Sequence, residues 1–429
     1  MTMQGTRPGT TEATRPLSLA YYSPGWPLDA APNGIVPYVH AMTEELRRVG
    51  HRVTILSLDS ARGTPDEVWS LRREVQATNR LGRVLDALTY RFSFAAGMNR
   101  QAVRVLTAEC RRLAALGWLD LIEMEESFGF ARGLQKNIDL PVVVRLHGPW
   151  FLNGLYVKPS EREANPSRIR DEGRAIGDAF AVISPSRDVL ERTRAYYGLP
   201  LADAEVVPPP STRVPPEDRW RAEDCDLELI LFVGRFDNHK GGDLVIEAFA
   251  EVLRRHPRAR LRFAGPDRGF LDEAGRTWTI EEFVRDRLPT GDAAGQFQWL
   301  GVQSASSIHD LRRKAGLVVV ASRYDNFPNT VTEAIAAGCP LVGAQAGGIP
   351  EMIQDGVNGL LFRAGDARHL AAQVCRLIED RGLAARLGRQ AGLDCERRYS
   401  PEKIAKDMES SYLRILDRWR AVHPPRKDA

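Results

Sequence analysis

Two cations and two carboxylates in the second half of the sequence have the types and spacing needed to bind a phosphorylated ligand. Arg235 and Lys240 stand five positions apart in the segment RFDNHKGG, so both can converge on one anion. Asp325 and Glu333 stand eight positions apart, so both can face one crevice and serve different parts of one ligand. Cations at an exposed loop tip also occur without any ligand, and that interpretation stays open at this point.

A helix start lies between the two carboxylates. Pro328 ends the loop that follows the apolar run 317–321, and Asn329 or Thr330 opens a helix. The free N–H groups and the positive dipole end of such a helix attract an anion. Thr330 and Glu333 also fit a capping box, in which the glutamate satisfies a backbone N–H. The sequence therefore leaves two roles for Glu333, a cap and a ligand contact.

A histidine in the first half is a further candidate. Residues 141–146 are typical of a strand buried on both faces, and His147 and Gly148 follow it directly. A histidine at the end of such a strand is better placed for a ligand than one on a packed face, and a histidine bonded to a backbone carbonyl is the competing interpretation. The run 119–124 predicts an exposed acidic turn, or contacts to an acceptor hydroxyl, for Glu123, Glu125 and Glu126.

Short apolar runs alternate with amphipathic helical stretches along almost the whole chain. This alternation predicts an α/β protein with two doubly wound, Rossmann-like parallel sheets, each covered by helices on both faces. Pro208, Pro209 and Pro210 begin a stiff linker between them. The predicted organisation is a disordered leader at 1–16, a first domain at 17–207, the linker at 208–216, a second domain at 217–398 and a closing helix at 399–422.

The totals fit two domains and exclude several classes of protein. The 429 residues are 43% hydrophobic and 27% charged, and a net charge of +3 is too small to imply a nucleic acid partner. Five scattered cysteines without CxxC spacing argue for reduced thiols in a cytoplasmic protein, against a disulfide framework and against structural zinc. The first residues lack the apolar core of a signal peptide, and no run approaches about 20 apolar residues.

Residues 61–117 combine a mostly helical pattern with many arginines, including Arg100 and Arg104. A basic amphipathic helix can lie on an anionic membrane. A solvated basic face over a buried apolar stripe is commoner, and we expect that arrangement here.

The stretch 325–351 resembles the nucleotide-binding signature of the retaining glycosyltransferases of family 4. The resemblance is carried by Asp325, Phe327, Pro328, Asn329, Thr330, Glu333, Ala334, Gly338, Pro340, Gly347, Gly348 and Glu351, and by Gly234, Arg235, Lys240 and Gly241. The family usually has Glu where this chain has Asp325. The resemblance implies a GT-B fold, with two Rossmann-like domains facing a central cleft. It also implies that the closing helix crosses back onto the first domain.

The same resemblance implies roles for individual residues. The second acid, Glu333, would hold the ribose, and the backbone before it would meet the diphosphate and the sugar. A histidine at the position of His147 would sit beside the reacting sugar. The implied catalytic residues are His147, Arg235 and Lys240. The implied donor-binding residues are Gly34 in the loop after the first strand, Arg235, Lys240, Asp325, Asn326, Phe327, Asn329, Thr330, Val331 and Glu333.

The resulting expectation is a retaining transferase that moves a sugar from a nucleoside-diphosphate donor, a UDP-sugar, to a small-molecule, glycan or lipid-linked acceptor. No Asp-x-Asp motif lies at a strand end of the crevice, so we expect metal-independent transfer with no cofactor. The alternatives are a non-catalytic subunit that binds nucleotide sugars, and an epimerase or phosphorylase with the same fold. The donor sugar, the acceptor and the oligomeric state cannot be deduced from the residues.

Overall fold

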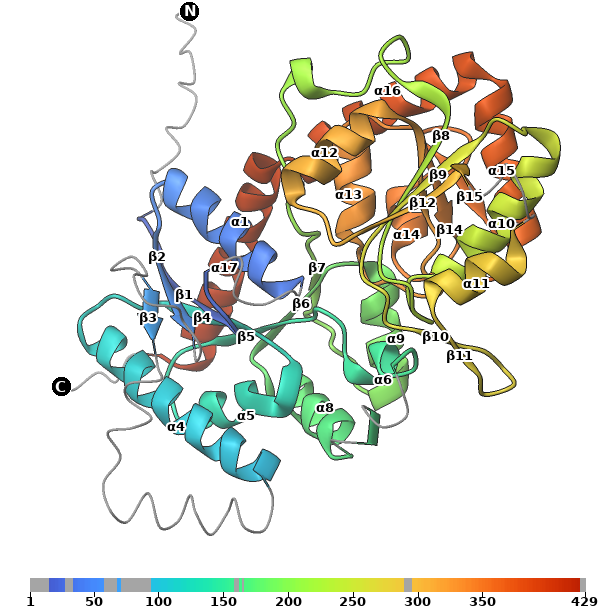
Figure 1. Ribbon diagram of the computed structural model, residues 1–429. Coiled ribbons are helices and arrows are strands. Elements are labelled where there is room, and N and C mark those ends of the chain that lie inside the picture. Colours follow the sequence, from blue (N-terminus) through green and yellow to red (C-terminus); the bar gives the residue numbers. More distant parts are fainter. Residues whose placement is uncertain are drawn as a thin grey trace, which may run out of the picture.

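The computed structural model describes residues 15–27, 34–57, 68–70, 94–157, 162–163, 166–288 and 295–424 (Figure 1). Two α/β domains lie side by side, and the closing helix runs from the second domain back to the first. Most of the predicted leader lies outside the described residues, as does Asn33, the neighbour of Gly34.

The first domain is built on a seven-stranded sheet in the order β3-β2-β1-β4-β5-β6-β7. Every pairing in it is parallel. Its central strands are buried on both faces, which explains their continuous apolar composition. The strands are β1 (Ser18–Ser23), β2 (Arg52–Ser57), β3 (Val68–Ser70), β4 (Leu121–Glu125), β5 (Val142–Arg145), β6 (Ala181–Ser184) and β7 (Glu205–Val206).

Helices cover both faces of this sheet. One apolar cluster joins the sheet to α4 (Phe94–Ala115), α5 (Phe130–Gln135), α8 (Arg168–Asp178) and α9 (Arg187–Tyr197). A second cluster on the opposite face joins it to α1 (Ile35–Arg48) and the closing helix. Part of the stretch 61–117 is not helical, because β3 forms there; the arginines between β3 and α4 lie outside the described residues.

The second domain has a six-stranded parallel sheet in the order β12-β9-β8-β13-β14-β15. These strands are β8 (Asp226–Val233), β9 (Arg260–Ala264), β12 (Phe297–Gly301), β13 (Ala315–Val320), β14 (Leu341–Ala344) and β15 (Leu360–Phe362). A separate antiparallel hairpin pairs β10 (Phe270–Leu271) with β11 (Thr277–Trp278). The sheet is covered by α10 (Gly242–Arg255), α11 (Ile280–Arg287), α12 (Ala305–Lys314), α13 (Asn329–Ala336), α14 (Ile349–Met352), α15 (Ala367–Glu379) and α16 (Arg381–Tyr399).

The closing helix α17 (Pro401–Val422) belongs to the core of the first domain. Ser400 caps its first turn, and its apolar face packs on α1 and on the first sheet. Deep in this contact the Tyr412 hydroxyl donates to Glu123 over 2.7 Å and accepts from Tyr21 over 2.5 Å. Because α17 follows α16 directly, it joins the two domains a second time, in addition to the chain crossing after β7.

The fold class predicted from the sequence is confirmed: both sheets are parallel, doubly wound and covered on both faces. Within the described residues, no helix is both long and apolar enough to cross a membrane.

Candidate active site

A cleft of about 410 Å³ lies between the two domains, where the carboxyl ends of strands from both sheets point toward each other. Ligands of parallel α/β sheets bind at this edge. Eight of the eleven predicted site residues line the cleft: Gly34, His147, Lys240, Asp325, Asn326, Phe327, Asn329 and Thr330. The other three, Arg235, Val331 and Glu333, do not.

The cleft holds an ion pair between residues that are 85 positions apart in the sequence. Lys240 Nζ donates to Asp325 Oδ2 over 2.6 Å, and the Ser322 hydroxyl donates to the same oxygen over 3.2 Å. Burial alone would raise the pKa of Asp325, but the Lys240 ammonium, His239 and Ser322 together hold that pKa below its ordinary value. Asp325 therefore stays ionised, and no hydrogen bond to its Oδ1 is found within the described part of the chain.

Arg235 lies on the same loop but outside the cleft. Its Nε donates to Asp237 over 2.5 Å, and its side chain is 44% exposed. Asp237 also accepts the backbone N–H groups of His239 and Lys240, so it shapes the loop that presents Lys240. The structure thus places the two predicted cations on different carboxylates, and their convergence on one anion stays a prediction.

The helix start expected at Asn329 or Thr330 is present, since α13 begins at Asn329. Its N-cap is Pro328, and no side chain caps it, so Thr330 and Glu333 do not form the capping box. The uncapped N–H groups at Asn329 and Thr330 meet the cleft and can bind an anion. Val331, one position further, is completely buried, and its backbone N–H already donates to the Pro328 carbonyl oxygen over 3.0 Å.

Glu333 has a third role that the sequence did not suggest. Its carboxylate pairs with Arg312, a side chain that is only 6% exposed, whereas Glu333 itself is 36% exposed. Glu333 is therefore both the partner of a buried cation and accessible from outside. The role of Glu333 in ribose binding is not tested by this contact.

Gly347 and Gly348, which follow β14, pack against the loop that carries Asp325. Their backbone approaches the loop after β13 closely: a Cβ at Gly347 would lie 2.0 Å from the Asp325 carbonyl oxygen, and one at Gly348 would lie 2.1 Å from that of Asn326. The glycines thus permit close packing of the two loops, which positions Asp325.

His147 faces the cleft from the first domain. Its ring packs edge-on against Tyr38, with 5.0 Å between centroids, and its carbonyl oxygen accepts from the Asn326 side chain over 2.8 Å. Among the described residues neither ring nitrogen bonds a backbone carbonyl, the arrangement of the competing interpretation. Burial, and secondly Arg145, lowers the pKa of His147 well below its usual range, which keeps the imidazole neutral.

Three carboxylates behind His147 were expected in an exposed turn, and that expectation is wrong: Glu123, Glu125 and Glu126 are all buried. The Glu126 carboxylate accepts the backbone N–H groups of His147 over 2.9 Å and of Gly148 over 2.8 Å. Burial and the neighbouring carboxylates raise its pKa to about 8. Glu126 therefore positions the histidine loop, a contact that links segments 21 residues apart and leaves no local sequence pattern.

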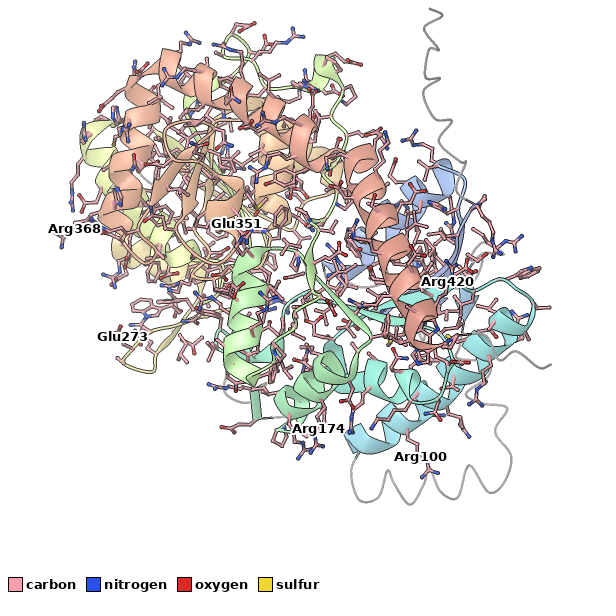
Figure 2. All side chains as sticks on the ribbon, turned by 180° about the vertical axis from the view of Figure 1, so that it is seen from behind. Arg100, Arg174, Glu273, Glu351, Arg368 and Arg420 are labelled. Atoms are coloured by element: carbon pink, nitrogen blue, oxygen red, sulfur yellow. The ribbon has the colours of Figure 1, made fainter. Side chains whose placement is uncertain are left out.

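Contacts around the cleft tie the domains together. The Glu351 carboxylate accepts the first two N–H groups of α9, those of Arg187 and Asp188, over 2.9 and 2.7 Å. Figure 2 shows Glu351 beside α9, at the boundary of the domains. Tyr324 also donates to Asp188 over 3.0 Å. The sequence analysis missed further residues that line the cleft, among them His239, which stacks on Tyr156, and Arg145.

The described residues contain no group of three or more His, Cys, Asp or Glu side chains arranged to hold a metal ion.

Solved structures with the same architecture define the class. Sucrose-phosphate synthase from Thermosynechococcus elongatus superposes with a TM-score of 0.67 at 18% identity, covering 94% of this chain and 100% of that chain. Anabaena HepE in complex with UDP-glucose superposes with a TM-score of 0.63 at 17% identity, covering 92% and 99%. At these identities the likeness shows the fold alone, the two-domain GT-B fold.

Comparison with models of protein families shows to which family the chain belongs. The model described as Glycosyltransferase Family 4 matches residues 32–210, and that described as Glycosyl transferases group 1 matches residues 217–393. Together they span most of the chain, which belongs to this glycosyltransferase family. A similar curated relative is a D-inositol 3-phosphate glycosyltransferase of Nocardiopsis dassonvillei, 26% identical over 307 residues. The match covers 67% of this chain and 66% of that relative, just under two thirds of its length.

Proposed function

We propose that this protein moves a sugar from a nucleoside-diphosphate sugar to an acceptor hydroxyl. The observation that carries the proposal is the meeting of Lys240, Asp325 and the uncapped start of α13 in one cleft, opposite His147. A diphosphate placed there would receive an ammonium and free backbone N–H groups, and the sugar attached to it would lie toward His147.

The main task of the site in this reaction is to stabilise the negative charge that develops on the departing phosphate. Transfer breaks the bond between the anomeric carbon and the phosphate oxygen, forms a bond from the acceptor oxygen to that carbon, and passes the acceptor proton to the departing phosphate. Lys240 and the N–H groups of Asn329 and Thr330 oppose the charge that develops on the phosphate. Asp325 uses Oδ2 to hold Lys240, which leaves Oδ1 to accept from a hydroxyl of the donor sugar.

We further propose that the anomeric configuration is retained and that no metal is required. The family resemblance supports retention, and the fixed cation and helix start supply the positive charge that a metal would otherwise provide. The UDP-glucose complex of HepE, which shares the fold, supports UDP as the nucleotide. Five free cysteines support a reducing, cytoplasmic location.

The test is a screen of UDP-sugars for UDP release that depends on the protein, first alone and then with candidate acceptors. We expect release with at least one donor, unchanged turnover in EDTA, and a product whose anomeric proton coupling matches that of the donor. Nucleotide binding without release from any donor would support a non-catalytic subunit instead, and an inverted linkage would exclude retention.

A further inference from the structure

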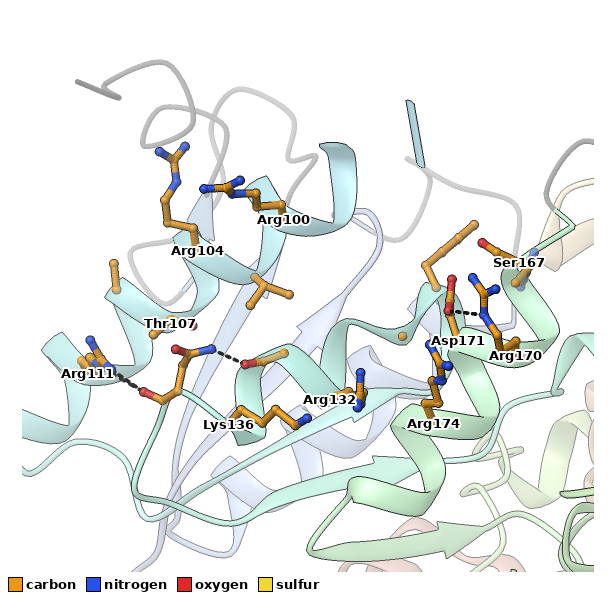
Figure 3. A pocket seen from close by; sticks show the side chains of 17 residues that line it. Arg100, Arg104, Thr107, Arg111, Arg132, Lys136, Ser167, Arg170, Asp171 and Arg174 are labelled. Atoms are coloured by element: carbon orange, nitrogen blue, oxygen red, sulfur yellow. Dashed lines mark hydrogen bonds and ion pairs between the residues drawn. The ribbon is translucent and has the colours of Figure 1, made fainter. Parts of the chain in front are cut away.

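A second, larger hollow lies on the first domain, outside the cleft. It has a volume of about 1020 Å³ and lies between α4, α5 and α8, as Figure 3 shows. Eight cationic side chains and a single carboxylate, Asp171, are among the described residues that line it. We call this hollow the basic groove. Its charge contrasts with the whole chain, whose net charge is only +3.

Four of the eight cations in the basic groove pair with nearby carboxylates: Arg132, Lys136, Arg168 and Arg170. By contrast, Arg100 and Arg174 are exposed and have no hydrogen-bond or ion-pair partner among the described residues. Like charges gathered in one hollow repel each other and attract anions.

The wall of the groove also carries a polar group without a partner. Thr107 on α4 is only 8% exposed, and its hydroxyl is buried with no hydrogen bond to any described residue. A buried hydroxyl is normally satisfied, and leaving it unsatisfied costs free energy. An anionic oxygen inside the groove would accept its proton. The cations and the hydroxyl are independent features that favour the same kind of ligand.

The basic groove meets the cleft at one side chain. Arg168 lines both hollows; its guanidinium lies over the rings of Phe128 at 4.5 Å and Trp150 at 4.0 Å, and its Nε donates to Glu172 over 2.7 Å. Phe128 has a φ of 59°, a strained conformation for a bulky residue. Such strain concentrates at functional sites.

We propose that the basic groove binds the anionic part of the acceptor, a phosphoryl or carboxylate group carried by a sugar or glycan, while the acceptor hydroxyl reaches the cleft past Arg168. This assignment of the acceptor class rests on the proposed transferase function. An acceptor held at both places would have its hydroxyl positioned before reaction, which lowers the entropic cost of transfer.

The shape favours a soluble ligand over a membrane surface. The cations lie around a hollow formed by three helices, and the unpartnered Thr107 hydroxyl is buried in its wall. Small ligands bind in such concave sites, whereas a helix on a membrane presents a basic face flanking an exposed apolar one.

The experiment compares the full-length protein with two variants of equal charge change. Arg100→Glu with Arg174→Glu alters the groove, and Arg368→Glu with Arg386→Glu alters exposed arginines on α15 and α16 of the second domain. Figure 2 shows Arg368 far from Arg100 and Arg174. Binding of tripolyphosphate and of tetragalacturonate is measured by calorimetry at 0.15 M NaCl with the cleft saturated by UDP. The two probes distinguish phosphoryl from carboxylate recognition.

We expect the wild type and the second-domain variant to bind at least one probe equally, and the groove variant to bind it at least tenfold more weakly. UDP affinity should be the same in all three. Thr107→Val, which keeps every charge, should weaken binding about tenfold to a hundredfold through one lost hydrogen bond to an anion.

The groove assignment would be overturned if probe binding were equally weakened in both charge variants, or if the wild type bound no probe. If UDP still bound in these cases, the proposed donor site would be unaffected. A different result would show that the basic groove binds a membrane surface and not the acceptor. In that result the groove variant binds the probes as the wild type does, but no longer sediments with vesicles of 30% phosphatidylglycerol in phosphatidylcholine. Absence of UDP binding to the wild type would instead overturn the proposed function, and the acceptor role with it.

Discussion

Replacing Lys240 with methionine removes the ammonium from the cleft while keeping most of the side-chain volume. In the present structure this ammonium neutralises Asp325, a residue that is only 9% exposed, over 2.6 Å. In the proposed reaction it also opposes charge on the leaving phosphate. The variant Lys240→Met should therefore lose both stability and turnover, for separate reasons.

The two losses can be estimated. Removing one partner of a buried ion pair costs about 3–5 kcal/mol, and the 25% exposure of the Lys240 side chain reduces this to about 2–4 kcal/mol of unfolding free energy. A unit charge about 4 Å from a developing charge is worth about 4 kcal/mol at an effective dielectric constant near 20. Partial neutralisation by Asp325 reduces that value, so we expect a loss of turnover on the order of a hundredfold, about 2.7 kcal/mol.

A double-mutant cycle with Asp325→Asn separates these effects. The assay is steady-state UDP release from the UDP-sugar that the wild type turns over fastest, alongside chemical unfolding. In the Asp325→Asn background, Lys240→Met should no longer destabilise the fold, because no buried carboxylate is left unpaired. It should still lower turnover on the order of a hundredfold.

Lys314→Met serves as the matched control, because Lys314 is exposed in the last turn of α12 and has no partner among the described residues. It should stay within twofold of the wild type. If the effect of Lys240→Met on turnover disappears in the Asp325→Asn background, Lys240 acts only by neutralising Asp325, and the leaving-group argument is refuted.

Four further predictions follow from other contacts. Glu333→Ala should weaken UDP binding measured by calorimetry. It should also lower the unfolding free energy by about 1–3 kcal/mol, because it leaves the buried guanidinium of Arg312 unpaired. Destabilisation with unchanged UDP affinity would show that Glu333 has only a structural role. His147→Ala should lower UDP release more than tenfold at unchanged UDP affinity. Because the pKa of His147 lies far below its usual range, no titration of this residue should appear in the wild-type rate between pH 6 and 9. The pKa of Glu126 is raised in the folded state to about 8, so its contribution to stability is complete below about pH 4.5 and is lost as pH rises toward 8; Glu126→Gln should flatten the melting temperature across this window, and an unchanged slope would contradict the assignment. Tyr412→Phe should cost about 1–3 kcal/mol of unfolding free energy by removing two buried hydrogen bonds, whereas Tyr196→Phe, whose side chain is exposed, should cost nothing measurable.

The sequence was informative where local pattern decides the structure. The strand from Ala315 to Val320 is buried on both faces, so its apolar run identified it, and the proline before Asn329 identified the helix start. The sequence did not predict the short strands β10 and β11, which have two residues each and depend on pairing with each other. Such segments have too few positions to show a period.

The site could be predicted residue by residue but not contact by contact. Lys240 and Asp325 were both chosen, yet nothing in the sequence shows that they pair with each other. Glu126 was misjudged because its partners are backbone N–H groups of a neighbouring strand end, which leave no side-chain signature. The basic groove was not anticipated either, since it needs three helices separated along the chain to converge.

The central claim is that Lys240 and the start of α13 bind the diphosphate of the donor. The most direct measurement is a crystal structure of the protein soaked with UDP. We predict that the terminal phosphate lies within hydrogen-bond distance of Lys240 Nζ and of the backbone N–H groups at Asn329 or Thr330. A nucleotide bound elsewhere, or a phosphate that touches neither group, would contradict the account.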